Sequence, residues 1–123
     1  MKTDPNCIFC KIVAGEIPSH KIYEDKDFFV FLDIHPASKG HTLVVPKKHE
    51  QWWLYQTDTE TTNTFQLSKK IGQSLKEVLD ADFIRLNIVG TDVPHVHIHL
   101  IPLKFYEDKS LCSRSEYLDG EAE

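Results

Sequence analysis

The stretch HVHIHLIP, residues 95–102, decides how this 123-residue chain folds, because it alternates histidines with aliphatic residues. In a β-strand, successive side chains point to opposite faces. One face is therefore predicted to carry His95, His97 and His99, and the opposite face the aliphatic residues between them. An aliphatic face belongs in a core, which leaves three imidazoles on the other face to form a site.

Strand patterns also occur earlier in the chain. KIYED (21–25) and DFFVFLDI (27–34) are rich in aromatic and β-branched residues and predict a hairpin. HTLVVP (41–46) predicts a third strand, closed by its proline, and FIRLNIVG (83–90) predicts a fourth. The short TDVP link then joins this fourth strand to residues 95–102.

Two segments have helical periodicity. IFCKIVAGEIP (8–18) predicts a short helix, with Gly15 as its C-terminal stop. Residues 57–80 carry apolar side chains every three to four positions and predict a long amphipathic helix, capped by Asp58 or Thr59. Short connections favour antiparallel pairing, so we expect an α+β fold, an antiparallel sheet of about five strands with one long and one short helix. The long helix is expected to cover the sheet face opposite the histidines.

Length and composition fit one domain, predicted over residues 7–102, with an N-terminal extension (1–6) and an acidic C-terminal tail (103–123). A net charge of -5 argues against broad nucleic-acid binding, which depends on clustered lysines and arginines. The N-terminus lacks the apolar stretch of a secretory signal, and no run approaches the ~20 apolar residues of a membrane span. We therefore expect a cytoplasmic protein with no nucleic-acid or membrane partner.

The cysteines indicate a metal or redox pair rather than a disulfide scaffold. Three cysteines leave one unpaired, and in a reducing compartment the C-x-x-C pair Cys7 and Cys10 suits a metal or redox role. The βαβ context of a thioredoxin-like site is absent. Together with His49 and one histidine of residues 95–99, the pair would make a closed zinc site, although His49 could equally be a solvated loop residue.

The three histidines admit two kinds of chemistry. A catalytic three-histidine zinc site needs imidazoles that converge, but the first and last of three alternate strand positions are about 13 Å apart. Alternatively, a neutral imidazole, with an ordinary pKa of about 6.5, can attack phosphorus without a metal. It then needs a neighbour that fixes its tautomer and exchanges protons with the leaving group. Histidines adjacent on one face supply that neighbour.

HVHIHLI (95–101) resembles the His-φ-His-φ-His-φ-φ signature, where φ is apolar, of the histidine triad family of nucleotide hydrolases and transferases. Four further segments are similar to their counterparts in the small nucleoside phosphoramidases and related bacterial members of that family: CIFCKIVAGEIP (7–18), KIYEDKDFFVFLDI (21–34), KGHTLVVPKKH (39–49) and the strand with Asn87. The resemblance covers about residues 7–102. It implies the family's fold and a homodimer whose two sheets join into one.

Carried over by position, the resemblance assigns catalytic roles. His97 is implied to be the nucleophile that forms a nucleotidyl-histidine intermediate. His99 and His41 are implied to be its hydrogen-bonding partners, which stabilise charge and pass a proton. Asn87 would help to position the phosphate. The family's chemical step needs no metal.

The resemblance also implies a site for a purine nucleotide, such as a derivative of AMP or GMP. Asp33 would accept hydrogen bonds from the ribose hydroxyls, and Gly90 would let a backbone N–H approach the phosphate. Asp92 lies in a short loop where many relatives have a serine, and an ionised carboxylate there would repel a phosphate. Apolar residues would line the base pocket, although each could instead belong to the core: Ile8, Phe9, Ile12, Ile17, Phe31 and Ile34.

Some relatives that keep the C-x-x-C motif and the later histidine bind structural zinc, which implies four ligands here: Cys7, Cys10, His49 and His95. The leading hypothesis is an enzyme that cleaves nucleoside 5′-phosphoramidates, or related P–N and P–O linked nucleotides, through His97. Two alternatives stay open. One is a nucleotide-binding or scaffold protein of the same fold with weak or vestigial catalysis, and the other is a hydrolase with a three-histidine catalytic zinc.

Overall fold

The computed structural model describes residues 1–107, and most of the predicted acidic tail, from residue 108 onward, lies outside the described residues. The elements follow one another as α1 (Ile8–Val13), β1 (Lys21–Glu24), β2 (Phe28–Leu32), β3 (Thr42–Pro46), a 3₁₀ turn (Trp53–Tyr55), α2 (Asp58–Leu79), β4 (Phe83–Ile88), β5 (Ile98–Leu103) and a second 3₁₀ turn (Phe105–Glu107). The strands form one antiparallel sheet in the order β1-β2-β3-β5-β4. The predicted α+β architecture is confirmed.

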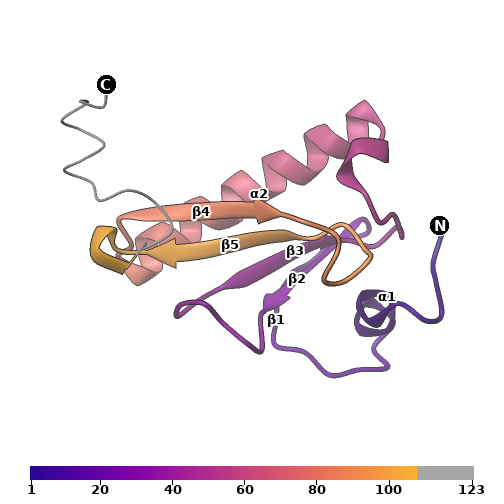
Figure 1. The fold of residues 1–123 in the computed structure, drawn as a ribbon, viewed down its shortest axis with the longest axis horizontal. Helices are drawn as coiled ribbons and strands as arrows, with labels where there is room; N and C mark the ends of the chain where they lie inside the picture. Colours follow the sequence, from indigo (N-terminus) through magenta and orange to yellow (C-terminus); the bar gives the residue numbers. More distant parts are fainter. Residues whose placement is uncertain (108–123) are drawn as a thin grey trace.

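α2 covers one face of the sheet, and Figure 1 shows it running along one side of the strands. Beneath it lies a buried cluster of alternate strand residues: Phe28, Val30, Val44, Ile98 and Leu100. The apolar stripe of α2 packs against this cluster through Leu67, Ile71 and Leu75. Ile98 and Leu100 thus face the helix as the alternation predicts.

Within residues 1–107, no helix combines the length and apolar content that a membrane span requires.

α1 lies near the N-terminus, away from α2 (Figure 1). A second buried cluster joins it to the other residues of β2 and β3: Cys7, Phe9, Cys10, Ile12, Phe29, Phe31, Leu43 and Val45. The helix ends at Val13 with Ala14 as its C-cap, and Gly15 follows with φ +82°, in agreement with its predicted role as the stop. Because α1 packs on β2 and β3, it covers only part of the face that carries the histidines.

The start of α2 corrects the predicted cap. Thr57, rather than Asp58 or Thr59, is the N-cap: its hydroxyl accepts a hydrogen bond from the Glu60 N–H at 3.1 Å. The Glu60 carboxylate in turn accepts from the Thr57 N–H at 2.8 Å. This capping box satisfies two amide groups near the helix start.

β5 begins at Ile98 rather than at the first histidine, which corrects the predicted strand. The ladder between β3 and β5 ends at the pair of Val44 and Ile98, although β3 itself runs on to Pro46, which has no N–H to donate toward residue 96. The N–H of Val96 instead donates to the carbonyl of Glu50 at 2.6 Å. The histidines therefore lie where a loop turns into a strand, and their side chains are free to diverge.

Both predicted domain boundaries are crossed by contacts. β5 runs to Leu103, one residue past the predicted end of the domain, and Leu103 is buried opposite Phe83. At the other end, the Lys2 carbonyl accepts a hydrogen bond from the His49 N–H at 2.7 Å. The N-terminal residues are thereby held against the domain.

Gly40 packs the loop before β3 against the end of α2. Its φ is +87°, and an added Cβ would lie 2.3 Å from Leu79 Cδ1. Gly15 has a similar φ of +82°, but an added Cβ there would meet nothing within 4 Å. An alanine at either position would adopt a strained left-handed backbone, but only an alanine at position 40 would also overlap a neighbour. Comparing the two substitutions therefore distinguishes the effect of backbone strain on stability from that of steric overlap.

We expect Gly40→Ala to lower the free energy of unfolding by about 2–4 kcal/mol, and Gly15→Ala by about 1–2 kcal/mol. Both variants strain the backbone, but only the first pushes a methyl group into Leu79. Urea denaturation of the two variants and the natural protein measures the difference. Equal losses would show that Leu79 turns away without cost.

Candidate active site and metal site

The three histidines of residues 95–99 divide between two groups of side chains. The first group comprises Cys7, Cys10, His49 and His95. The second consists of two overlapping triplets, Asp33 with His41 and His99, and Asp92 with His97 and His99. The three imidazoles therefore do not converge on one point, as a three-histidine catalytic zinc site requires.

The first group is built on the start of α1. Its C-x-x-C spacing puts Cys7 at the N-cap, where Cys7 Sγ accepts the Cys10 N–H at 3.4 Å. His95 Nδ1 lies 3.2 Å from Cys7 Sγ and 3.5 Å from Cys10 Sγ. His49 Nδ1 lies 3.5 Å from Cys10 Sγ and 3.2 Å from His95 Nδ1. Ligand atoms around a tetrahedral Zn²⁺ are about 3.3–3.8 Å apart, so these four distances are close to those of such a site, and all four atoms lie within 4.8 Å of one another.

Both imidazoles of this group are oriented by contacts on their far sides. His95 Nε2 donates to the Pro46 carbonyl at 2.7 Å, so the neutral ring carries its lone pair on Nδ1, toward the sulfurs. Burial lowers the pKa of His95 to about 4, which keeps the ring neutral. A carboxylate oxygen of Asp4 lies 3.9 Å from His49 Nε2. Such outer partners are typical of histidines that bind metals.

Burial also acts on the thiol of Cys10 and raises its pKa to about 11. A cation between the two sulfurs would stabilise the thiolate, so metal binding and loss of the proton are coupled. Two sulfurs and two imidazole nitrogens form a closed set of four ligands. These residues would therefore hold a structural ion and leave no position open for a substrate.

His97 is oriented by the backbone of His95. Its Nδ1 lies 2.6 Å from the His95 carbonyl oxygen. A carbonyl can only accept, so Nδ1 carries the proton and Nε2 of the neutral ring holds the lone pair. The ring is 1% exposed, and Phe9 of α1 packs edge-on against it with ring centroids 4.8 Å apart. The fold thus presents one nucleophilic nitrogen in a fixed direction.

Hydrogen bonds also fix the tautomers of His41 and His99. The Ala37 N–H donates to His41 Nδ1 at 3.0 Å, so the neutral His41 carries its proton on Nε2. That proton is donated to His99 Nδ1 at 2.9 Å, which leaves His99 with an N–H at Nε2. Burial lowers the pKa of both rings and favours these neutral forms. His99 therefore offers a donor beside the lone pair of His97, with ring centroids 4.8 Å apart.

The sheet register brings further polar residues to this face. Asn87 of β4 pairs with His99 of β5, so their side chains lie on the same side of the sheet. Asp33 Oδ2 lies 3.5 Å from His41 Nε2. Arg85, two residues before Asn87, shares their face, and its charge adds to burial in lowering the pKa of His41. The sequence analysis missed Arg85, although the R-x-N spacing in a strand indicates it.

Asp92 is turned toward the histidines. One of its carboxylate oxygens lies 3.4 Å from His97 Nε2 and 3.8 Å from His99 Nε2. Burial opposes ionisation, but hydrogen bonds from backbone N–H groups and the neighbouring His97 outweigh it and lower the pKa of Asp92. An ionised carboxylate therefore faces Nε2 of His97 and favours a proton on it, so the carboxylate must move aside before this nitrogen can offer its lone pair to phosphorus.

The residues predicted to line a base pocket fall into two sets. Four of them form or border the buried cluster beneath α1: Phe9, Ile12, Ile17 and Phe31. Ile8 and Ile34 are 46% and 73% exposed. The buried set has a core role, and the exposed pair offers free apolar surface.

The packing around residue 90 explains why it is a glycine. Its φ is +108°, and an added Cβ would lie 3.1 Å from the Gln51 carbonyl oxygen and from two ring carbons of Trp52. The Gln51 side-chain amide also donates to the Gly90 carbonyl at 3.3 Å. Close packing against Trp52 therefore requires glycine here, apart from any approach to a phosphate.

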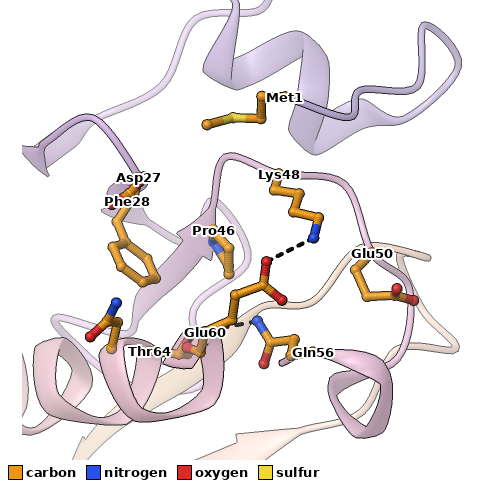
Figure 2. A pocket seen from close by; sticks show the side chains of 10 residues that line it. Met1, Asp27, Phe28, Pro46, Lys48, Glu50, Gln56, Glu60 and Thr64 are labelled. Carbon is orange, nitrogen blue, oxygen red and sulfur yellow. Dashed lines mark hydrogen bonds and ion pairs between the residues drawn. The ribbon is translucent and has the colours of Figure 1, made fainter. Parts of the chain in front are cut away.

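A separate pocket of about 290 Å³ lies between the N-terminal part of α2 and the ends of β2 and β3. Figure 2 shows two interactions among its polar side chains. Lys48 Nζ lies 2.8 Å from a Glu60 oxygen, and the Gln56 amide donates to the Thr64 hydroxyl at 3.4 Å. None of the residues predicted for the site lines this pocket. This pocket is therefore separate from the histidine site.

Comparison with known proteins agrees with this assignment. The family model described as the HIT domain matches residues 14–106. The chain belongs to the HIT family. The matched region of this HIT protein includes all the histidines described above, whereas Cys7 and Cys10 precede it.

Other HIT proteins are similar to it in sequence and in fold. An uncharacterised HIT-like protein of Methanocaldococcus jannaschii is 45% identical over 100 residues, which cover 78% of each chain. The adenosine 5′-monophosphoramidase of Saccharomyces cerevisiae is 40% identical over 102 residues, which cover 80% of this chain and 63% of that protein. The crystal structure of a Zn-bound histidine triad family protein from Mycobacterium smegmatis matches with a TM-score of 0.77 and 33% identity, over 89% of this chain and 82% of that one.

The geometry of the first group predicts zinc binding coupled to proton release. Zinc added to metal-free protein is expected to raise the free energy of unfolding, by about 4 kcal/mol when free zinc is at a thousandfold excess over Kd. Because Cys10 holds a proton at neutral pH, the affinity should rise with pH. Calorimetry in buffers of different ionisation enthalpy measures the protons released.

Cys10→Ser should weaken zinc binding at least about tenfold, because a serine oxygen is a poor ligand for Zn²⁺ at neutral pH. His20→Ala, a change at an exposed histidine outside the group, is the matched control and should leave affinity unchanged. A natural protein whose unfolding is indifferent to zinc would contradict the assignment.

Proposed function

We propose that this HIT protein is a nucleotide hydrolase or transferase that cleaves nucleoside 5′-phosphoramidates, or related P–N and P–O linked nucleotides, through a nucleotidyl-histidine intermediate on His97. The observation that carries the proposal is the pairing of tautomers. His97 Nε2 offers a lone pair, and His99 Nε2 offers a proton beside it. The S. cerevisiae relative, named an adenosine 5′-monophosphoramidase, supports the same reaction class.

In the first step, His97 Nε2 bonds to phosphorus and the bond from phosphorus to the leaving nitrogen breaks. The leaving nitrogen keeps the electron pair and takes the proton from His99 Nε2. Two groups stabilise the deprotonated ring of His99. One is the N–H of His41, 2.9 Å from His99 Nδ1, and the other is the positive charge that develops on the neighbouring His97 ring. The His95 carbonyl supports that charge through its bond to His97 Nδ1.

In the second step, water attacks phosphorus and gives a proton to His99 Nε2. The bond between phosphorus and His97 Nε2 breaks, and the electron pair returns to that nitrogen. Both histidines regain the tautomers of the resting protein, and a nucleoside monophosphate is released. An acceptor alcohol or amine in place of water would make the reaction a transfer.

The remaining residues are proposed to bind the purine nucleotide. Asn87, level with His99 in the sheet, positions the phosphate, and Gly90 lets a backbone N–H approach it. Asp33 is proposed to accept hydrogen bonds from the ribose hydroxyls. The base would lie against the apolar residues near α1, with Ile8 and Ile34 as the exposed contacts. Four of the apolar residues support this surface from within: Phe9, Ile12, Ile17 and Phe31.

One observation favours a second candidate function, a nucleotide-binding protein with weak catalysis. The Asp92 carboxylate lies 3.4 Å from the nucleophilic nitrogen and repels an approaching phosphate. Tight binding of AMP without turnover would identify this function.

A structural Zn²⁺ is proposed for the group of two cysteines and two histidines. The Zn-bound relative of M. smegmatis supports it, as does the fit of the four ligand atoms. A bound ion would neutralise the thiolates and tie α1 to the segment that carries the catalytic candidates. In this proposal the chemical step itself uses only the histidines.

His97→Ala is expected to lower kcat/KM for AMP release from adenosine 5′-phosphoramidate by at least about a thousandfold, because no other nitrogen occupies the position of attack. His97→Gln is a second variant, since its amide can still donate to the His95 carbonyl and preserve the fold. Chromatography of released AMP, with and without a chelator, measures both. Circular dichroism shows whether each variant is folded.

His20→Ala serves as the control and should retain full activity, because this exposed histidine lies outside both groups. Turnover by a folded His97 variant would refute the intermediate. AMP binding without turnover by the natural protein would favour the second candidate.

A homodimer is also proposed, formed along β4. This strand is at the edge of the described sheet, and between it and α2 lies a mainly apolar groove of about 570 Å³. Phe65 and Leu86 line the groove and are 37% and 41% exposed. A second copy packed here would cover them and join the two sheets into one.

Leu86→Arg is expected to shift the protein from dimer to monomer, because the charge would be buried without a partner in the interface. Ile22→Arg, on the opposite edge strand β1 and 44% exposed in the natural protein, is the matched control and should stay dimeric. Sedimentation velocity over a range of concentrations measures the masses. A natural protein that is monomeric throughout would rule out this interface.

A further inference from the structure

A carboxylate oxygen of Asp92 lies close to the reacting nitrogen, Nε2 of His97. The direction of its contact matters more than its distance of 3.4 Å. Its Oδ2 lies in hydrogen-bonding geometry with Nε2 of His97, so it occupies the in-plane direction in which that nitrogen carries either its N–H or its lone pair. The carboxylate therefore occupies the line along which phosphorus must approach.

A phosphate and this carboxylate cannot occupy the same place. The Asp92 side chain is 53% exposed and lies on a short loop, so it can swing outward while the loop stays. In phosphoryl transfer the leaving atom lies opposite the nucleophile, in line through phosphorus. A carboxylate displaced outward along that line ends beside the leaving group.

The charge of Asp92 is not compensated by basic residues near it in the chain. No lysine or arginine occurs between Val89 and Leu103. His97, which it faces, favours the ionised form of the carboxylate. When the carboxylate swings outward, as phosphate binding requires, its negative charge lies at the mouth of the site.

We propose that Asp92 selects the leaving group, and that the preferred substrates are nucleoside 5′-phosphoramidates of amines that bear a second, positively charged ammonium group. This inference rests on the proposed function and names the substrate class for the same site. His97 attacks and the P–N bond breaks as before, and the departing nitrogen takes the proton of His99. The remote ammonium group pairs with Asp92 throughout and exchanges no proton.

The test uses three adenosine 5′-phosphoramidates whose amines have the same chain length and differ in remote charge. They are made from 1,4-diaminobutane, butylamine and 4-aminobutyrate, which are cationic, neutral and anionic at the far end. With the natural protein, kcat/KM should fall in that order, by at least about tenfold from the cationic to the anionic substrate, the ratio expected for unit charges separated by about 6 Å at the dielectric constant of bulk water. The preference should shrink in 1 M salt.

Asp92→Asn removes the charge and keeps the shape, so the ratio between the cationic and anionic substrates should fall to less than about twofold. Asp58→Asn, an exposed carboxylate at the start of α2, is the matched control and should keep the natural ratio. An unchanged ratio in Asp92→Asn would overturn the inference, as would equal rates for the three substrates with the natural protein.

These outcomes are separate from failure of the proposed function. If the neutral butylamine substrate is cleaved in a way that depends on His97 but remote charge has no effect, the function stands and the role of Asp92 is refuted. If none of the three substrates is cleaved by the natural protein, both the proposed function and this inference fail.

Discussion

The 2.6 Å hydrogen bond from His97 Nδ1 to the His95 carbonyl holds the two sites of this protein together. Without it, either ring nitrogen of His97 could carry the proton, and the lone pair would have no fixed direction. The bond is reliable because His95 itself is fully buried and held on its other side by the Pro46 carbonyl. Burial lowers the pKa of His41 and His99 and favours their neutral forms, in which His41 donates to His99 and His99 offers an N–H beside His97.

Most of the fold could be predicted from periodicity, because α2 packs on one face of the sheet and α1 on part of the other, so alternate strand residues enter different clusters. The alternation of residues 95–102 correctly placed Ile98 and Leu100 beneath α2. It failed for the start of β5, because the ladder with β3 ends at the pair of Val44 and Ile98: Pro46 has no N–H to donate, and the Val96 N–H bonds to the Glu50 carbonyl instead. The cap of α2 was missed by one residue, although Thr57 and Glu60 carry the spacing of a capping box.

The site was predicted less completely, and the reasons are three-dimensional. Motif spacing proposed the ligand atoms that converge around Cys10, but only the fold brings residues so far apart in the chain within bonding distance. Arg85 escaped notice because a single arginine in a strand has no motif of its own, and only its two-residue spacing from Asn87 indicates that it shares the histidine face. The direction of Asp92 depends on the path of its loop, which sequence does not specify.

The contact between the two sites is made by a backbone atom, and this has a consequence for how HIT proteins can diverge. Any residue at position 95 would offer the same carbonyl oxygen to His97, whereas only histidine offers Nδ1 to the cysteines. A lineage can therefore exchange the metal ligands for ordinary core packing and still inherit an oriented nucleophile. The stabilising element and the reactive element are neighbours in the chain but separable in evolution, and the first can be replaced without rebuilding the second.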